Sequence, residues 1–203
     1  MTRADRTPRQ RLDAEERRKA ILDAGRGLFA GSSFSEVSTQ RVAAAAGASQ
    51  ALVFHYFGSK AGLYTAVVED AVEHLQAALR SADRALPAGA PTRDRVRAAL
   101  LVYLDEVARY PRAWAPHRGA EEPAAATAVR LRARADQVAG LRGWLRLDAA
   151  AWPRHEYALW GFFGFVDSAC LAWVDAGCPE ADRHPLVEAA LGALEGALGD
   201  WGG

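Results

Sequence analysis

Two short helical segments separated by a glycine constrain this chain more than any other feature of its sequence. Ser38 stands where an N-cap belongs ahead of residues 39–46, and Gly47 ends that run after about two turns. Ser49 repeats the pattern at the start of residues 50–56. Because isolated helices this short are unstable in water, both segments must be stabilised by packing against neighbouring elements.

This arrangement is typical of a helix-turn-helix, whose first helix crosses the DNA backbone while the second reaches base edges in the major groove. We expect an inward set of Val42, Ala43, Val53 and Phe57. The outward set is then Gln50, Ala51, Leu52, His55 and Tyr56. Glutamine pairs bidentately with adenine, and small apolar side chains touch the methyl group of thymine.

Phosphate contacts position such a motif without specifying sequence. The backbone N–H groups at the Ser38 and Ser49 caps, the Tyr56 hydroxyl and Lys60 are expected to bind phosphates. The complete set of predicted DNA-binding residues is Ser38, Thr39, Gln40, Ser49, Gln50, Ala51, Leu52, His55, Tyr56 and Lys60.

The distribution of charge favours the same interpretation, although the chain as a whole is neutral, with 25 basic and 25 acidic residues. Residues 1–60 hold ten Lys or Arg against six Asp or Glu, a net charge of +4. The other residues hold 15 against 19, a net charge of −4. A basic head on an acidic body is expected when only one end of a protein meets phosphate.

The rest of the sequence predicts an all-α fold of about nine helices, since no segment alternates long enough for a strand. After a flexible arm over residues 1–12, helices are expected near residues 13–30, 39–46, 50–56, 60–84, 93–109, 121–147, 154–176 and 185–198. We expect a DNA-binding domain over residues 1–60 and a larger helical domain for ligand binding and dimerisation over residues 61–203.

Residues 41–64, RVAAAAGASQALVFHYFGSKAGLY, resemble the TetR family of bacterial regulators. The family pattern is a helix ending in Ala-Gly, a small hydroxyl residue, a short recognition helix, then Tyr-Phe, a short gap and Lys. The match covers about residues 15–64 and weakens beyond Tyr64. Phe54 stands where these proteins usually carry tyrosine, which removes a hydroxyl that contacts phosphate.

With only two cysteines, the chain fits a reducing cytoplasm. The resemblance implies a homodimer in which two C-terminal helices of each subunit form a four-helix bundle. Small residues at positions 161, 164 and 168 allow a second helix to approach closely, and residues 187–198 form an apolar stripe. The predicted dimer interface is Gly161, Gly164, Ser168, Val187, Leu191, Leu194 and Leu198.

The resemblance also implies a repressor released from a palindromic operator by a small molecule. Aromatic residues beside helices interrupted by Pro and Gly suit a cavity for an apolar or aromatic effector, with His117 or Asp167 as a polar anchor. The predicted pocket residues are Tyr103, Trp114, His117, Trp144, Trp160 and Phe163. Aromatic residues at helical spacing are more often plain core, and that alternative stays open.

Other classes of function find little support. Residues 157–174 are apolar enough to span a membrane but contain Asp167, which favours a helix buried in a protein core. Metal, phosphate-loop and hydrolase motifs are absent, so no enzyme and no cofactor is expected, and Cys170 and Cys178 suggest no disulfide framework. The alternative function is a helical adaptor for protein partners, without sequence-specific DNA binding.

Overall fold

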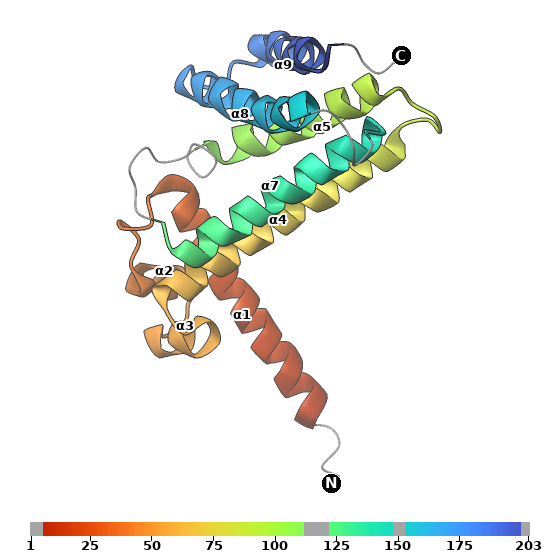
Figure 1. Cartoon of the computed structure of the whole chain (residues 1–203). Helices are drawn as coiled ribbons and strands as arrows, with labels where there is room; N and C mark the ends of the chain where they lie inside the picture. The colour runs from red at the N-terminus through yellow and green to blue at the C-terminus, as the bar shows by residue number, and fades with distance from the viewer. Residues whose placement is uncertain (1–5, 112–121, 148–152, 200–203) are drawn as a thin grey trace. The chain divides into compact units, whose positions relative to one another are not determined.

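The computed structural model describes residues 6–111, 122–147 and 153–199, with side chains from residue 14 onward. Over these residues the fold is all-α, as predicted, with eight α-helices, one 3-10 helix and no strand (Figure 1). The helices are α1 (Arg6–Gly31), α2 (Thr39–Ala45), α3 (Gln50–Phe57), α4 (Lys60–Ala85), α5 (Thr92–Arg109), α7 (Ala124–Trp144), α8 (Pro153–Asp175), the 3-10 helix η1 (Glu180–Asp182) and α9 (Arg183–Leu198).

The first helix is longer than the sequence predicts. Residues 6–12, expected to belong to a flexible arm, form the start of α1. Pro8 does not prevent this because it lies in the first turn, where a backbone N–H has no acceptor within the helix. Residues 1–5 of the predicted arm lie outside the described residues.

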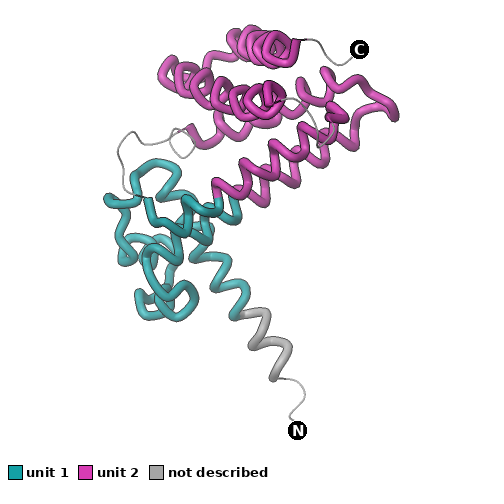
Figure 2. The backbone as a smooth tube through the Cα atoms, viewed as in Figure 1, with its two compact units in different colours: residues 1–71, 116–129 teal, residues 72–115, 130–203 magenta. Residues whose placement is uncertain are grey.

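The chain divides into two compact units (Figure 2). The head unit consists of residues 1–71 with 116–129, and the body unit consists of residues 72–115 with 130–203. The boundary predicted after residue 60 lies within the head unit, because the first twelve residues of α4 are grouped with the head.

The head unit has its own hydrophobic core, contributed by α1, α2, α3, α4 and the segment before α2. Ile21, Val42, Val53 and Leu63 are completely buried in it, and Phe29 meets the ring of Tyr64 edge-on at 4.9 Å. As expected from their length, α2 and α3 depend on this packing for their stability.

Local capping defines where the short helices begin. The Ser38 hydroxyl accepts from the Arg41 backbone N–H at 3.2 Å, and the Ser49 hydroxyl accepts from the Leu52 N–H at 3.2 Å. These are the caps that the sequence predicts. Gly47, which ends α2, has φ +61, a left-handed conformation that glycine adopts without steric cost.

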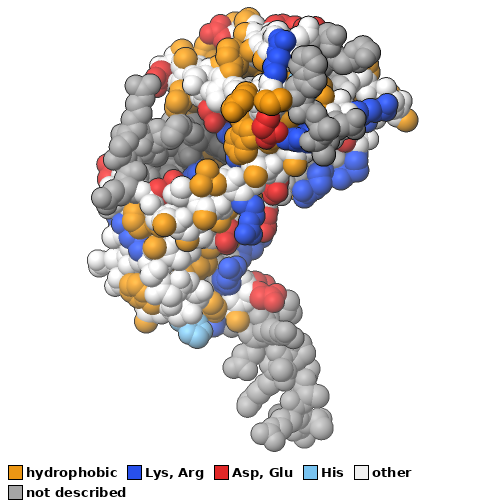
Figure 3. Space-filling model, viewed as in Figure 1, with side chains coloured by type: hydrophobic (Ala, Val, Ile, Leu, Met, Phe, Trp, Pro, Cys, Tyr) orange, Lys and Arg blue, Asp and Glu red, His pale blue; other side chains and the backbone are white. Residues whose placement is uncertain are grey.

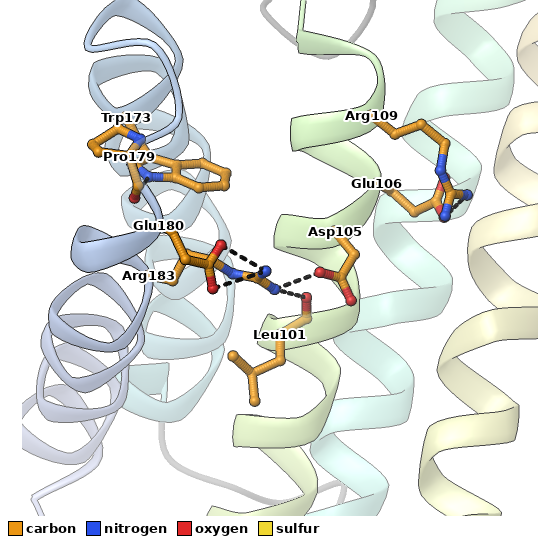
Figure 4. Close-up of polar contacts among 8 residues, drawn as sticks. All are labelled: Leu101, Asp105, Glu106, Arg109, Trp173, Pro179, Glu180 and Arg183. Carbon is orange, nitrogen blue, oxygen red and sulfur yellow. Dashed lines mark hydrogen bonds and ion pairs between the residues drawn. The ribbon is translucent and has the colours of Figure 1, made fainter.

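The body unit is built around α5, α7, α8 and α9, and its core includes Leu104, Leu159 and Leu191, all completely buried. Figure 4 shows how the start of α9 is attached to α5: Arg183 donates to the Leu101 carbonyl and pairs with Asp105 and Glu180. The contacts of Arg183 with Leu101 and Asp105 join segments far apart in the sequence.

In the first turn of α4, the close approach to the end of α3 leaves room only for glycine at position 62. A Cβ atom there would lie 2.1 Å from the Phe57 carbonyl oxygen, a backbone atom that cannot move without shifting the turn. We expect Gly62→Ala to destabilise the head by about 1–3 kcal/mol. Urea unfolding measures the change, with Gly27→Ala as the control.

Gly27 lies within α1 and is exposed, and a Cβ atom at this position would have no neighbour within 4 Å. Alanine is the better helix former, so Gly27→Ala should raise stability by up to about 1 kcal/mol. Equal responses of the two variants would contradict the proposed role of Gly62 in the turn.

Candidate DNA-binding site and ligand cavity

Helix α3 exposes one side of the helix-turn-helix. Gln50, Ala51 and His55 are exposed, as predicted for the outward set. Leu52 and Tyr56 differ from the prediction: both are half-buried and pack against the head core. The reason is helical spacing, which places positions 52 and 56 beside the buried Val53 on the inner side.

Phe54 is a further candidate, although the sequence marks it only as a departure from the family pattern. Its side chain is 44% exposed on α3, although it is large and apolar. Its position four residues after Gln50 and three after Ala51 is the signal that places it on the same side of the helix. The outward side of α3 therefore combines an amide, a methyl group, a phenyl ring and an imidazole.

Thr39 was expected to contact DNA but is buried, with 8% of its surface exposed. Its hydroxyl oxygen accepts a hydrogen bond of 2.8 Å from Nε2 of Gln50. The Thr39 side chain is therefore held inside the head and bonded to Gln50, and it is not part of the exposed surface. Gln40 and Ser38 on the same segment are exposed.

Three basic side chains lie around the motif. Lys60 donates to the Ser35 carbonyl at 3.3 Å and places its ammonium 4.4 Å from the ring centre of Phe34. Arg41 is exposed on α2, and Arg18 of α1 lies over the Phe57 ring at 5.1 Å. Through these two contacts, Lys60 connects the start of α4 to the segment before α2.

Acidic side chains are scarce on this part of the surface. In Figure 3 the surface over α2 and α3 on the face in view is mostly uncharged, with hydrophobic and histidine side chains among white atoms. Such a surface does not repel phosphate.

The body unit contains a cavity of about 430 Å³. It lies among α4, α5, α7 and α8 and has a largely apolar wall with polar groups contributed by α4 and α7. The apolar lining residues are Leu79, Val96, Ala99, Leu100, Tyr103, Leu141, Trp144, Phe162, Phe163 and Val166. The polar lining residues are Gln76, Arg80, Asp83, Arg134, Asp136 and Gln137.

The cavity includes some of the predicted pocket residues and not others. Tyr103, Trp144 and Phe163 line it. Trp160 does not line it, because its ring is 44% exposed on another side of α8 and its indole N–H donates to Glu156 at 3.1 Å. Trp114 and His117 lie outside the described residues.

A polar cluster joins three helices at the cavity wall. Arg134 on α7 donates to both carboxylate oxygens of Asp167 on α8, at 2.7 and 2.8 Å. The Tyr103 hydroxyl on α5 donates to the same carboxylate at 3.3 Å. Burial, with the nearby Asp167 charge, raises the pKa of Tyr103 above its usual range, so the hydroxyl stays a donor. Asp167 thus anchors Arg134, which itself lines the cavity.

The predicted dimer interface is partly wrong. Val187, Leu191, Leu194 and Leu198 are buried inside the core of the body unit, so they offer no surface to a second copy. The stripe on α9 is apolar because α5 and α8 of the same chain cover it. By contrast, Gly161, Gly164 and Ser168 are exposed on α8.

The exposed side of α8 is apolar as well as small. Tyr157 is 78% exposed, Trp160 44% and Phe165 38%. Among the described helices, α8 is the one long and apolar enough to cross a membrane, with a mean hydropathy of 1.3. Its opposite side is packed in the body core and includes Leu159, Phe162 and Trp173.

A capped helix-turn-helix with an exposed second helix lies in the same chain as a helical unit with a cavity. A helix-turn-helix of this kind is typical of DNA-binding proteins. Residues 21–67 match the family model of "Bacterial regulatory proteins, tetR family". The predicted resemblance to the TetR family is therefore confirmed for the segment that carries the motif.

A curated relative matches part of the chain. The "HTH-type transcriptional activator FasR" of Mycolicibacterium smegmatis is 32% identical over 95 residues. That alignment covers 47% of this chain and 42% of the relative, so it spans less than half the length of either protein.

The solved structures show the fold over most of the chain. A TetR-family transcriptional regulator from Streptomyces coelicolor has a TM-score of 0.71 and 23% identity, covering 90% of this chain and 79% of its own. The transcriptional regulator FadR from Bacillus subtilis, solved in complex with stearoyl-CoA, has a TM-score of 0.70 and 14% identity. It covers 87% of this chain and 96% of its own.

Filling the cavity should prevent an apolar probe from binding. Ala99 is a small residue of α5 that lines the cavity, and Ala108 of the same helix is exposed. We expect Ala99→Phe to weaken binding of the fluorescent probe 1-anilinonaphthalene-8-sulfonate at least severalfold, because the added ring occupies the space. Ala108→Phe should bind like the original protein. Equal binding by all three proteins would show that the probe does not use the cavity.

Proposed function

We propose that this chain is a ligand-responsive transcriptional regulator that acts in the cytoplasm and binds double-stranded DNA as a homodimer. The observation that supports this best is the geometry of α3. Its inner side is fixed in the head core by Val53, while Gln50, Ala51, Phe54 and His55 remain exposed. A short helix held in this way presents its side chains to base edges in the major groove.

The exposed side chains suit a mixed form of readout. The Gln50 amide matches the acceptor and donor of adenine, while Ala51 and Phe54 match the methyl group of thymine. Arg41, Lys60 and the cap at Ser49 are suited to phosphates, which set the register of the motif without specifying sequence. The proposed operator is therefore rich in A·T pairs where α3 enters the groove.

A homodimer explains the exposed apolar side of α8. Tyr157, Trp160 and Phe165 with Gly161 and Gly164 form a surface that a second copy would cover. The buried stripe of α9 does not contribute to this surface. Its opposite side does, where Ala189, Gly192 and Gly196 are exposed and small enough for close helix packing. A twofold dimer matches a palindromic operator with two half-sites.

The cavity is the proposed effector site. Its apolar wall with polar groups on one side suits a small molecule with an apolar or aromatic body. The complex of the Bacillus subtilis FadR with stearoyl-CoA supports an effector of this kind on a similar fold. Ligand binding alters DNA affinity only as far as the ligand binds one conformation of the protein better than another.

Helix α4 is the proposed route of this coupling. Its last turns contribute Leu79, Arg80 and Asp83 to the cavity, while its first turns contribute Leu63 and Val67 to the head core. The repressor expectation rests on the family resemblance alone, and the relative FasR is a transcriptional activator. The proposal therefore concerns DNA binding and ligand response, and leaves the sign of regulation to experiment.

Selection of bound sequences from random duplex DNA tests the proposed function. We expect a palindrome to be enriched. Gln50→Ala should then lower affinity by about 1–3 kcal/mol for the enriched duplex and relax the preference at one base position. Arg41→Ala is the matched comparison, because loss of a phosphate contact weakens all duplexes alike. If no sequence is enriched, the chain is a helical adaptor instead.

A further inference from the structure

The contact between Thr39 and Gln50 crosses the turn of the helix-turn-helix. Thr39 is the first residue of α2 and Gln50 is the first residue of α3, eleven positions later. Among the described residues Thr39 is the buried polar side chain, with 8% of its surface exposed, whereas Gln50 is exposed. The acceptor, Thr39, is thus fixed inside the head. The donor, Gln50, belongs to the surface proposed to face DNA.

The hydrogen bond limits the positions that the Gln50 amide can adopt, and in the structure its nitrogen faces Thr39. The terminal torsion of a glutamine side chain has a broad, roughly twofold profile, so an exposed amide readily exchanges its oxygen and nitrogen positions. Here the nitrogen of Gln50 lies 2.8 Å from the Thr39 hydroxyl oxygen and donates one of its two hydrogens to it. The second hydrogen and the carbonyl oxygen are left for another partner.

The second N–H and the carbonyl oxygen of Gln50 match the hydrogen-bonding groups of one base better than those of another. Adenine offers an acceptor at N7 and a donor at N6 in the major groove, whereas guanine offers acceptors at both N7 and O6. An amide that presents one donor and one acceptor fits adenine. An amide with its orientation reversed would accept from the Thr39 hydroxyl, which can donate as well as accept, and would present both N–H donors toward the two acceptors of guanine. The structure has the first of these two orientations.

We propose that Thr39 is a positioning residue for base recognition, which holds the Gln50 amide in the orientation that discriminates adenine from guanine. The inference rests on the proposed function, and it gives Thr39 a role different from the surface contact that the sequence predicts. The bond also removes rotational freedom from Gln50 before DNA arrives, so less side-chain entropy is lost on binding.

The test compares the affinity of the protein for a duplex with adenine and for a duplex with guanine at the position that Gln50 contacts. Once selection and Gln50→Ala have identified the base that Gln50 contacts, two duplexes are compared, one with adenine and one with guanine at that position. The original protein should favour adenine by about tenfold or more. Thr39→Val, which keeps the shape but removes the hydroxyl, should bring this ratio close to one. Thr39→Ser, which keeps the hydroxyl, should preserve it.

A role of Thr39 in stability alone gives a different result. In that case Thr39→Val would weaken both duplexes equally and leave the ratio unchanged, which would overturn the proposal. A preference of the original protein for guanine would also overturn it. In the Gln50→Ala background, Thr39→Val should leave the ratio as it is, since the amide that Thr39 positions is gone.

A measurement on the original protein keeps the proposal testable if Thr39→Val does not fold. NMR relaxation of side-chain amides should show a higher order parameter for Gln50 than for Gln40, an exposed glutamine on α2. Equal values would contradict the proposed restraint. Failure of the proposed function would look different, because the original protein would then enrich no sequence at all.

Discussion

Burial of one side of α3 is the constraint on which the proposed DNA-binding surface depends. The helix has eight residues, too few to be stable in water alone. The completely buried Val53, with the half-buried Leu52, Tyr56 and Phe57, fixes it to a core contributed by α1, α2 and α4. Because this side is fixed, the other side is exposed and has a defined orientation. The Ser49 hydroxyl accepts from the Leu52 backbone N–H in the first turn of the helix.

In the body unit, the arrangement of the cavity wall depends on pairing the charges that lie beside an apolar lining. Arg134 and Asp167 pair with each other, and the Tyr103 hydroxyl completes the cluster. A partly buried arginine without a partner would be costly, so the pairing keeps charge at the wall compatible with an apolar lining. Arg134 also lies 4.8 Å from the ring centre of Phe163. The cavity thus combines apolar surface with a fixed donor.

Features encoded by local sequence could be predicted, and features that depend on distant neighbours could not. The caps at Ser38 and Ser49 and the glycine that ends α2 each act within a few residues. The stripe on α9 was recognised as apolar, but periodicity does not reveal that α5 and α8 cover residues such as Leu191. The bond from Gln50 to Thr39 joins two helices and has no signal in local sequence. Pro8 suggested an arm because a first-turn proline is compatible with either structure.

The most direct test of DNA binding by the head is the salt dependence of its affinity for the selected duplex. If the head binds DNA, neutralised phosphates release counterions, and the logarithm of the association constant falls linearly with the logarithm of the salt concentration. Affinity should drop by about tenfold or more between about 50 and about 200 mM salt. An affinity that does not change with salt, or no binding even at the lower concentration, would contradict the claim that this helix-turn-helix binds DNA.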